Sequence, residues 1–104
     1  MPSATASAKV VLINTFVVPA PMEEAFLQWW RMTRPMFAAQ PGFISAKLHR
    51  SLDQKEQYRF INIAEWEGSD LYRQALSNIV SMLPKPSIAG LEWHPALYEV
   101  IEEA

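Results

Sequence analysis

The amino-acid sequence predicts one small α+β domain of the split β-α-β type, with a four-stranded antiparallel sheet. The chain has 104 residues, which is enough for a single domain. Segments with the apolar periods of strands and helices follow one another in the order β-α-β-β-α-β. Short, right-handed connections then place the first and third strands side by side, with both helices on one face of the sheet.

The first strand is expected at 9–18, where β-branched residues end at the turn Pro19-Ala20-Pro21. Both faces of this strand are largely apolar, so it belongs at the centre of the sheet. A helical period follows over 22–40. Pro21 suits the first helical position, and Pro35 is expected to kink or restart the helix near its end.

The remaining elements are two strands joined by a polar hairpin loop, a second helix, an irregular proline-containing stretch and a last strand. Ser69 or Asp70 can cap the second helix. The element order is that of ferredoxin-like folds. The expected ranges are 43–52 and 58–67 for the strands, 51–57 for the loop, 71–81 for the helix, 84–95 for the irregular stretch and 96–101 for the last strand.

Composition restricts the chemistry that the chain can carry. Its net charge is −2 with no basic run, which argues against nucleic acid and anionic membranes as partners. It has no cysteine, so disulfides, thiolate catalysis and Cys-ligated metal centres are excluded. Residues 1–8 are small and polar and do not resemble a signal peptide, and no apolar run could span a bilayer. We therefore expect a disordered tail at 1–8, one domain at 9–104 and a cytoplasmic protein.

Large apolar residues are more numerous than a domain of this size easily buries. Hydrophobic residues make up 50% of the chain and include four Trp, five Phe and five Met. The sheet face without helices also needs a cover. Pairing with a second copy through the sheet faces would bury the excess, and closed two-fold dimers are the commonest assembly. We therefore expect a homodimer.

Two amides lie in strands that are otherwise apolar. Asn14 is in the middle of the first expected strand and Asn62 in the middle of the third, so the topology makes them neighbours. A buried amide without partners costs roughly 1–3 kcal/mol. Trp66 follows on the same face as Asn62, and Tyr72 begins the second helix. Either the amides satisfy each other in the core, or these residues mark a small-molecule pocket.

Other candidate sites have less support in the sequence. His49 and His94 are too far apart to show metal-ligand spacing, so no metal site is predicted. Arg31 and Arg34 on the first helix could bind an anionic substrate, or they could form a solvated helix face. Three glycines are too few for a phosphate-binding loop. No Ser-His-Asp or paired-carboxylate arrangement stands out.

Four segments carry a resemblance to a known family: Leu12-Ile13-Asn14, Gln40–Phe43, Tyr58–Glu67 and Ala96–Val100. Through them the chain resembles the antibiotic biosynthesis monooxygenase family, and the resemblance extends from Val10 to Ile101. Members of this family are ferredoxin-like domains that dimerise through their sheets into an α/β barrel. The resemblance thus implies the same fold and the same dimeric assembly.

The resemblance also implies a monooxygenase that needs no cofactor. An electron-rich phenol, quinol or enol would lose a proton in the pocket, pass an electron to O2 and recombine with the reduced oxygen. The catalytic residues would be Asn62, Trp66 and Tyr72. Among them only Tyr72 can transfer a side-chain proton, and its pKa, ordinarily about 10, would have to fall. The residues that bind the aromatic substrate would be Asn14, Phe16, Phe60, Trp29 and Arg34.

Two other functions stay open. A second branch of the family degrades haem with an Asn on the first strand, a Trp on the third strand and a His on the second helix. Asn14 and Trp66 match the first two, but the second helix contains no histidine. Alternatively, the chain is a non-catalytic dimeric module that binds a hydrophobic metabolite. An assay for turnover would separate such a module from an enzyme.

Overall fold

The computed structural model describes residues 8–104, so most of the expected tail lies outside the described residues. The elements follow the predicted order, with two short 3-10 helices added, η2 (Ala20–Met22) and η3 (Val80–Met82). The strands are β1 (Val10–Val17), β2 (Phe43–Arg50), β3 (Phe60–Trp66) and β4 (Glu92–Tyr98). The two helices are α1 (Glu23–Ala38) and α2 (Ser69–Ile79).

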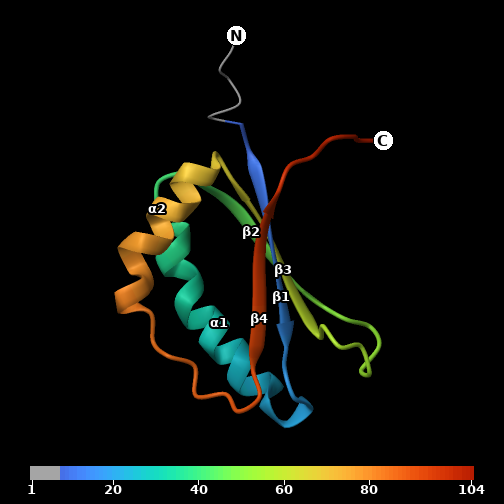
Figure 1. Ribbon diagram of the computed structural model, residues 1–104. Coiled ribbons are helices and arrows are strands. Elements are labelled where there is room, and N and C mark those ends of the chain that lie inside the picture. The colour runs from blue at the N-terminus through green and yellow to red at the C-terminus, as the bar shows by residue number, and fades with distance from the viewer. Residues whose placement is uncertain (1–7) are drawn as a thin grey trace.

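The four strands form one antiparallel sheet in the order β2-β3-β1-β4 (Figure 1). The predicted central pair, β1 and β3, is confirmed. In its register Asn14 lies directly opposite Asn62, and on the other side Asn14 lies opposite Pro95 of β4. Directly opposed residues point to the same face of a sheet, so both amides project from the middle of one face.

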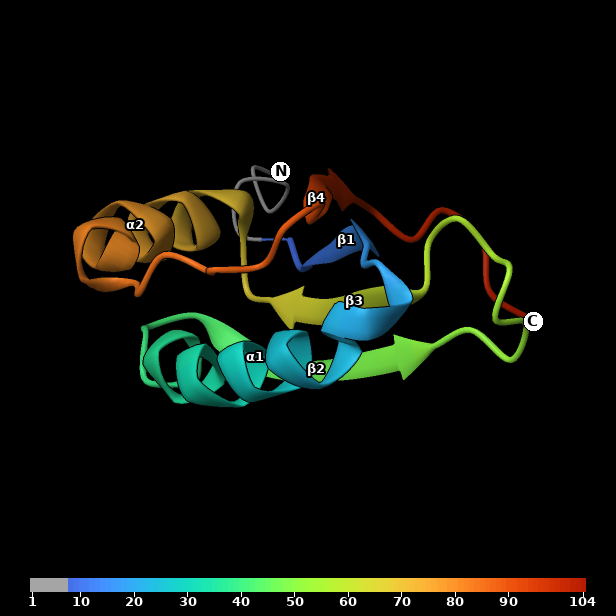
Figure 2. The ribbon, with the colours of Figure 1, turned by 90° about the horizontal axis from the view of Figure 1, so that it is seen from below.

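Both helices lie on that face, and no helix of the described residues covers the other one (Figure 2). Apolar residues between the layers form two separate clusters. The first consists of buried Leu12, Ala64, Trp66 and Ala75. The second consists of buried Phe16, Val18, Phe26 and Phe60. Asn14 and Asn62 belong to neither cluster and lie at the level between them.

Several predicted boundaries and details need correction. The last strand is not 96–101: β4 begins at Glu92 and contains Pro95. A proline is tolerated there because β4 is an edge strand, paired only with β1. Neither Ser69 nor Asp70 caps α2, whose N-cap is Gly68 without a side-chain hydrogen bond. α1 does not restart at Pro35 but continues through it to Ala38.

The turn between α1 and β2 requires a glycine at position 42. Gly42 has a φ of +93°, a left-handed conformation that side chains rarely adopt. A Cβ on Gly42 would lie only 2.6 Å from the Cβ of Leu71 in α2. The Gly42 carbonyl also accepts a hydrogen bond of 2.8 Å from the Glu67 N–H. This turn therefore fixes the start of α2, where Tyr72 lies.

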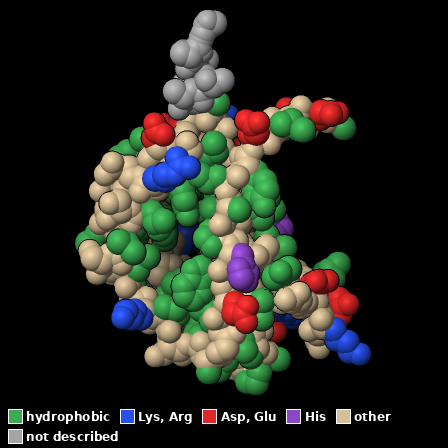
Figure 3. Space-filling model, viewed as in Figure 1, with side chains coloured by type: hydrophobic (Ala, Val, Ile, Leu, Met, Phe, Trp, Pro, Cys, Tyr) green, Lys and Arg blue, Asp and Glu red, His purple; other side chains and the backbone are tan. Residues whose placement is uncertain are grey.

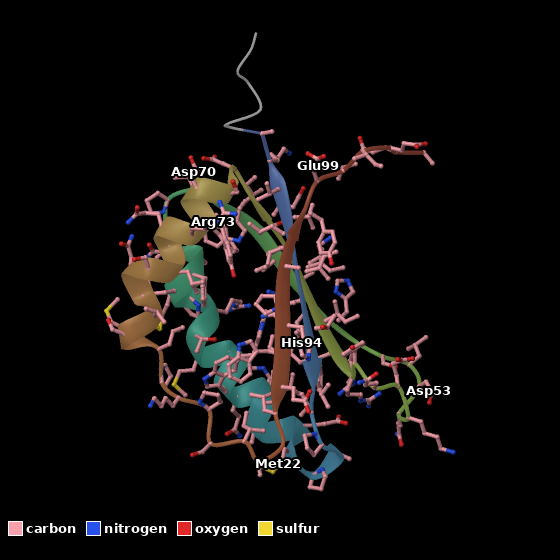
Figure 4. The ribbon with its side chains drawn as sticks, in the orientation of Figure 1. Met22, Asp53, Asp70, Arg73, His94 and Glu99 are labelled. Atoms are coloured by element: carbon pink, nitrogen blue, oxygen red, sulfur yellow. The ribbon has the colours of Figure 1, made fainter. Side chains whose placement is uncertain are left out.

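The helix layer is antiparallel. Met22 precedes α1 at one end of this layer, and Asp70 lies in the first turn of α2 at the other end (Figure 4).

None of the described helices is long and apolar enough to cross a membrane.

Candidate active site

A cavity of about 720 Å³ lies between the sheet and the helix layer. Figure 3 shows a hollow between the helices and β4, bordered mainly by hydrophobic side chains. The two core clusters fill the space on either side of the asparagines, and the cavity occupies the level between them. Its volume falls within the range of about 300–1,000 Å³ that is usual for small-molecule sites.

Three buried polar atoms of the cavity residues have no hydrogen-bond partner among the described residues. They are the Oδ1 atoms of Asn14 and Asn62 and the Nε1 of Trp66. The asparagines therefore do not satisfy each other, although they lie side by side. An unpaired buried polar group costs about 1–3 kcal/mol, so such groups are uncommon and point to a role beyond packing. A ligand in the cavity could pair with them.

Trp66 and Tyr72 form an aromatic corner of the cavity together with Phe43. The Trp66 and Tyr72 rings meet edge to face, with 5.5 Å between their centroids. Phe43 packs against Trp66 in the same manner at 5.4 Å. Burial raises the pKa of the Tyr72 hydroxyl above its ordinary value of 10.0. This direction is opposite to the fall that a general base would need, so Tyr72 is a neutral phenol that can donate a hydrogen bond.

Most of the predicted site residues do line the cavity: Asn14, Phe16, Trp29, Arg34, Asn62, Trp66 and Tyr72. Phe60 does not belong to this lining. It is 1% exposed, and its ring centroid lies 4.8 Å from that of Phe26, so it fills the core. Trp29 is a wall residue whose Nε1 already donates a hydrogen bond of 2.9 Å to the Pro84 carbonyl.

Sequence reasoning missed part of the wall, including the segment 83–86 and Trp93 and Pro95 of β4. The segment after α2 has no periodic pattern that could reveal it. The two-residue period of a strand could have revealed Trp93 and Pro95, because they alternate with Leu97 and therefore share its face. A strand extended backwards past the proline would have placed them opposite Phe16 and Asn14.

Neither histidine lines the cavity. His94 lies opposite Thr15 and His49 opposite Ile61, so both project from the face of the sheet that lacks helices. Within residues 8–104, no group of three His, Asp or Glu side chains could hold a metal ion. The cavity residues therefore offer neutral polar groups, aromatic rings and cations, but no imidazole.

The fold is that of the ferredoxin-like α+β domains, and its apolar cavity contains two amide oxygens and an indole N–H without hydrogen-bond partners among the described residues. The family model of antibiotic biosynthesis monooxygenases matches residues 9–78. The chain belongs to this family, and the predicted fold class is confirmed.

Individual relatives include oxygenases. Deoxynogalonate monooxygenase of Streptomyces nogalater is 38% identical over 72 residues, which are 66% of this chain and 56% of the relative. The match thus spans little more than half of that relative's length. A solved structure from Shewanella loihica PV-4, with a provisional monooxygenase name, has a TM-score of 0.85 and 40% identity, covering 93% of this chain and 98% of that one. SnoaB, a cofactor-independent oxygenase from Streptomyces nogalater, has a TM-score of 0.67 and 25% identity, covering 92% and 96%.

Proposed function

We propose that the protein is a cofactor-independent monooxygenase that oxidises an electron-rich aromatic, quinol or enol substrate with O2. The observation that carries the proposal is the set of unpaired polar atoms on Asn14, Asn62 and Trp66 in an otherwise apolar cavity. The monooxygenase and cofactor-independent oxygenase among its relatives support the class of reaction.

The cavity suits the formation of a substrate anion. Trp66 Nε1 and the neutral Tyr72 hydroxyl are hydrogen-bond donors, and the amides of Asn14 and Asn62 can donate or accept. Donors fixed in an apolar cavity stabilise a developing oxyanion more strongly than water does, because little solvent screens them. Such donors would lower the pKa of a bound phenol or enol, so that its proton leaves for water. In this proposal Asn62, Trp66 and Tyr72 stabilise the anion, and Tyr72 does not act as its base.

The anion then reacts with O2 directly. It passes one electron to O2, which gives a substrate radical and superoxide. Their recombination forms a C–O bond and a peroxide anion, which takes a proton back from water. The resulting hydroperoxide, at a carbon that still carries hydrogen, loses water to leave a carbonyl group. One atom of O2 thus enters the product and the other leaves as water. The protein supplies orientation, desolvation and stabilisation of charge.

Oxygen uptake in metal-free buffer tests the proposal, with the anthrone form of rhein as the substrate. We expect turnover by the wild type. Each of Asn62→Ala and Trp66→Phe should lower kcat/KM by roughly 10-fold to 100-fold, the value of one hydrogen bond to a charged group. Asn78→Ala, at an exposed position of α2 outside the cavity lining, is the matched control. Full activity in both site variants, while they remain folded, would remove these residues from the mechanism, and a non-catalytic binding module would show no turnover.

Haem degradation does not fit the residues of this cavity. Haem iron is usually held by an axial His, Cys, Met or Tyr. Of these residue types the cavity contains only Tyr72, and the burial that raises its pKa disfavours a phenolate ligand. α2 has no histidine at all. We therefore do not extend the haem chemistry of the family to this chain.

We further propose a homodimer formed through the sheet faces that lack helices. The middle of this face is apolar, with Ile63 of β3 opposite Ile13 of β1 and Ala96 next in the row. Ile63 is 38% exposed, and a partner sheet on this face would cover it.

Light scattering at micromolar concentration tests this assembly. We expect the mass of a dimer for the wild type and of a monomer for Ile63→Lys. Met32→Lys, at an exposed position of α1, should leave the dimer intact. A monomeric wild type would contradict the proposal.

A further inference from the structure

The charged residues around the cavity are all cations. Among residues 8–104, Arg34 and Lys85 are the charged residues of the lining, and no Asp or Glu contributes to it. The whole chain has a net charge of −2. The positive charge at the cavity is therefore a local feature that the overall composition does not explain.

The Arg34 guanidinium lies beside the cavity, next to the ring of Trp30 on the same helix, α1. Its Cζ lies 5.8 Å from the centroid of the Trp30 ring, within the range of cation–π contacts, and Trp30 itself lines the cavity. Arg31 lies three residues earlier and pairs instead with Glu24, with 3.9 Å between Nη1 and Oε1. Arg31 is not part of the cavity lining. The structure thus places Arg34, and not Arg31, at the cavity.

Lys85 is an exposed residue of the cavity lining and lies in the loop between η3 and β4. The residue before it, Pro84, accepts the hydrogen bond from Trp29 Nε1, which fastens this loop to α1. Arg34 and Lys85 therefore belong to one connected wall on the helix side. Asn14 and Asn62 belong to the opposite wall, which the sheet forms.

We propose that Arg34 and Lys85 bind a carboxylate carried by the aromatic substrate, and that they make the enzyme selective for acidic polycycles. The aromatic part of this substrate rests on the function proposed above. A guanidinium pairs with both oxygens of a carboxylate, and the Lys ammonium adds a point charge. A ligand between the layers then has its acid group against the helix wall and its reacting oxygen against Asn62 and Trp66. Arg34 and Lys85 are specificity residues and take no part in the oxidation.

Two ligands of nearly equal shape test this selectivity. Rhein is a dihydroxyanthraquinone with a carboxylate, and chrysophanol has a methyl group in its place. All four tryptophans of the chain, Trp29, Trp30, Trp66 and Trp93, line the cavity, so quenching of their fluorescence reports its occupancy. The quantity to compare among variants is the ratio of the two dissociation constants at neutral pH, since a general effect on folding cancels in it.

We expect the wild type to bind rhein more tightly than chrysophanol. Arg34→Gln and Lys85→Gln should each reduce this preference by up to roughly fivefold, the upper end for a solvent-exposed ion pair, and added salt should reduce it further. Arg31→Gln is the matched control and should leave the ratio unchanged. Equal binding of the two ligands, binding of neither, or an unchanged ratio in both Arg34→Gln and Lys85→Gln would overturn the inference.

Oxygen uptake with the anthrone forms of the same pair separates this inference from the proposed function. Turnover of both anthrones without preference for the acid would overturn the selectivity and support the oxygenase. Acid-selective binding that depends on Arg34 and Lys85, without any turnover, would support the carboxylate site and overturn the oxygenase.

Discussion

Replacing Asn62 by leucine should stabilise the protein and lower its activity. Asn62 lies in the middle of β3, and its Oδ1 is buried without a partner. Leucine is close to asparagine in shape and has no polar atom. The substitution therefore removes an unpaired group from the apolar wall and, at the same time, removes a group that we propose the substrate needs.

The size of the stabilisation follows from the cost of the unpaired amide, which is about 1–3 kcal/mol. Asn62 is half-buried, because part of its amide contacts the cavity. We therefore expect a stabilisation at the lower end of this range, about 1 kcal/mol. For a domain of about 100 residues this corresponds to a Tm higher by about 4–8 °C.

Urea unfolding at one fixed protein concentration measures the effect, since self-association would otherwise change the apparent stability. Asn78→Leu is the matched control. The Asn78 amide is paired: its Oδ1 accepts from Gln74 at 3.1 Å and its Nδ2 donates to Gln40 at 3.1 Å. The control should lose about 0.5–1 kcal/mol. If Asn62→Leu also lost about 1 kcal/mol or more, Asn62 would be a structural residue and the reasoning from its unpaired oxygen would be refuted.

Three further predictions concern stability. Gly42→Ala should cost about 2–4 kcal/mol, because the new Cβ would lie 2.6 Å from Leu71 Cβ at a φ of +93°; a Tm within about 2 °C of the wild type would contradict this. Burial raises the pKa of Tyr72, so its contribution to stability is present below its ordinary pKa of 10.0 and is lost as the pH rises through the higher pKa of the folded state. In urea titrations across alkaline pH, Tyr72→Phe should therefore show a smaller loss of stability than the wild type, and an equal loss would contradict the raised pKa. Arg59→Gln should cost about 1–2 kcal/mol, because the Arg59 Nε lies 3.0 Å from Glu23 Oε2 in an ion pair whose side chains are 11% and 24% exposed; an unchanged unfolding midpoint would show that this pair contributes nothing.

The topology could be predicted because local pattern and connection rules agree. Two apolar faces placed β1 at the centre of the sheet, and short connections placed β3 beside it. The start of β4 could not be predicted in the same way. Pro95 is a strand breaker when only the sequence is considered, and its position on an edge strand is a property of the assembled sheet.

The site could be predicted at the positions where a polar residue interrupts an otherwise apolar strand. Asn14 and Asn62 stand out because amides are unexpected in apolar central strands. Phe16 and Phe60 share the same face and lie opposite each other, so the sequence could not show that Phe16 borders the cavity while Phe60 does not. Lys85 lies in a stretch without any period. Its place in the cavity wall follows from tertiary packing, including the bond between Trp29 and Pro84.

The most direct test of the proposed chemistry is the stoichiometry of oxygen uptake with rhein anthrone in chelator-treated buffer. The wild type should consume one O2 for each quinone formed, well above the spontaneous rate. The triple variant Asn14→Ala/Asn62→Ala/Trp66→Phe, if still folded, should fall to near that background. Uptake by the wild type at only the spontaneous rate, or a triple variant as active as the wild type, would contradict the assignment of the reaction to these three side chains.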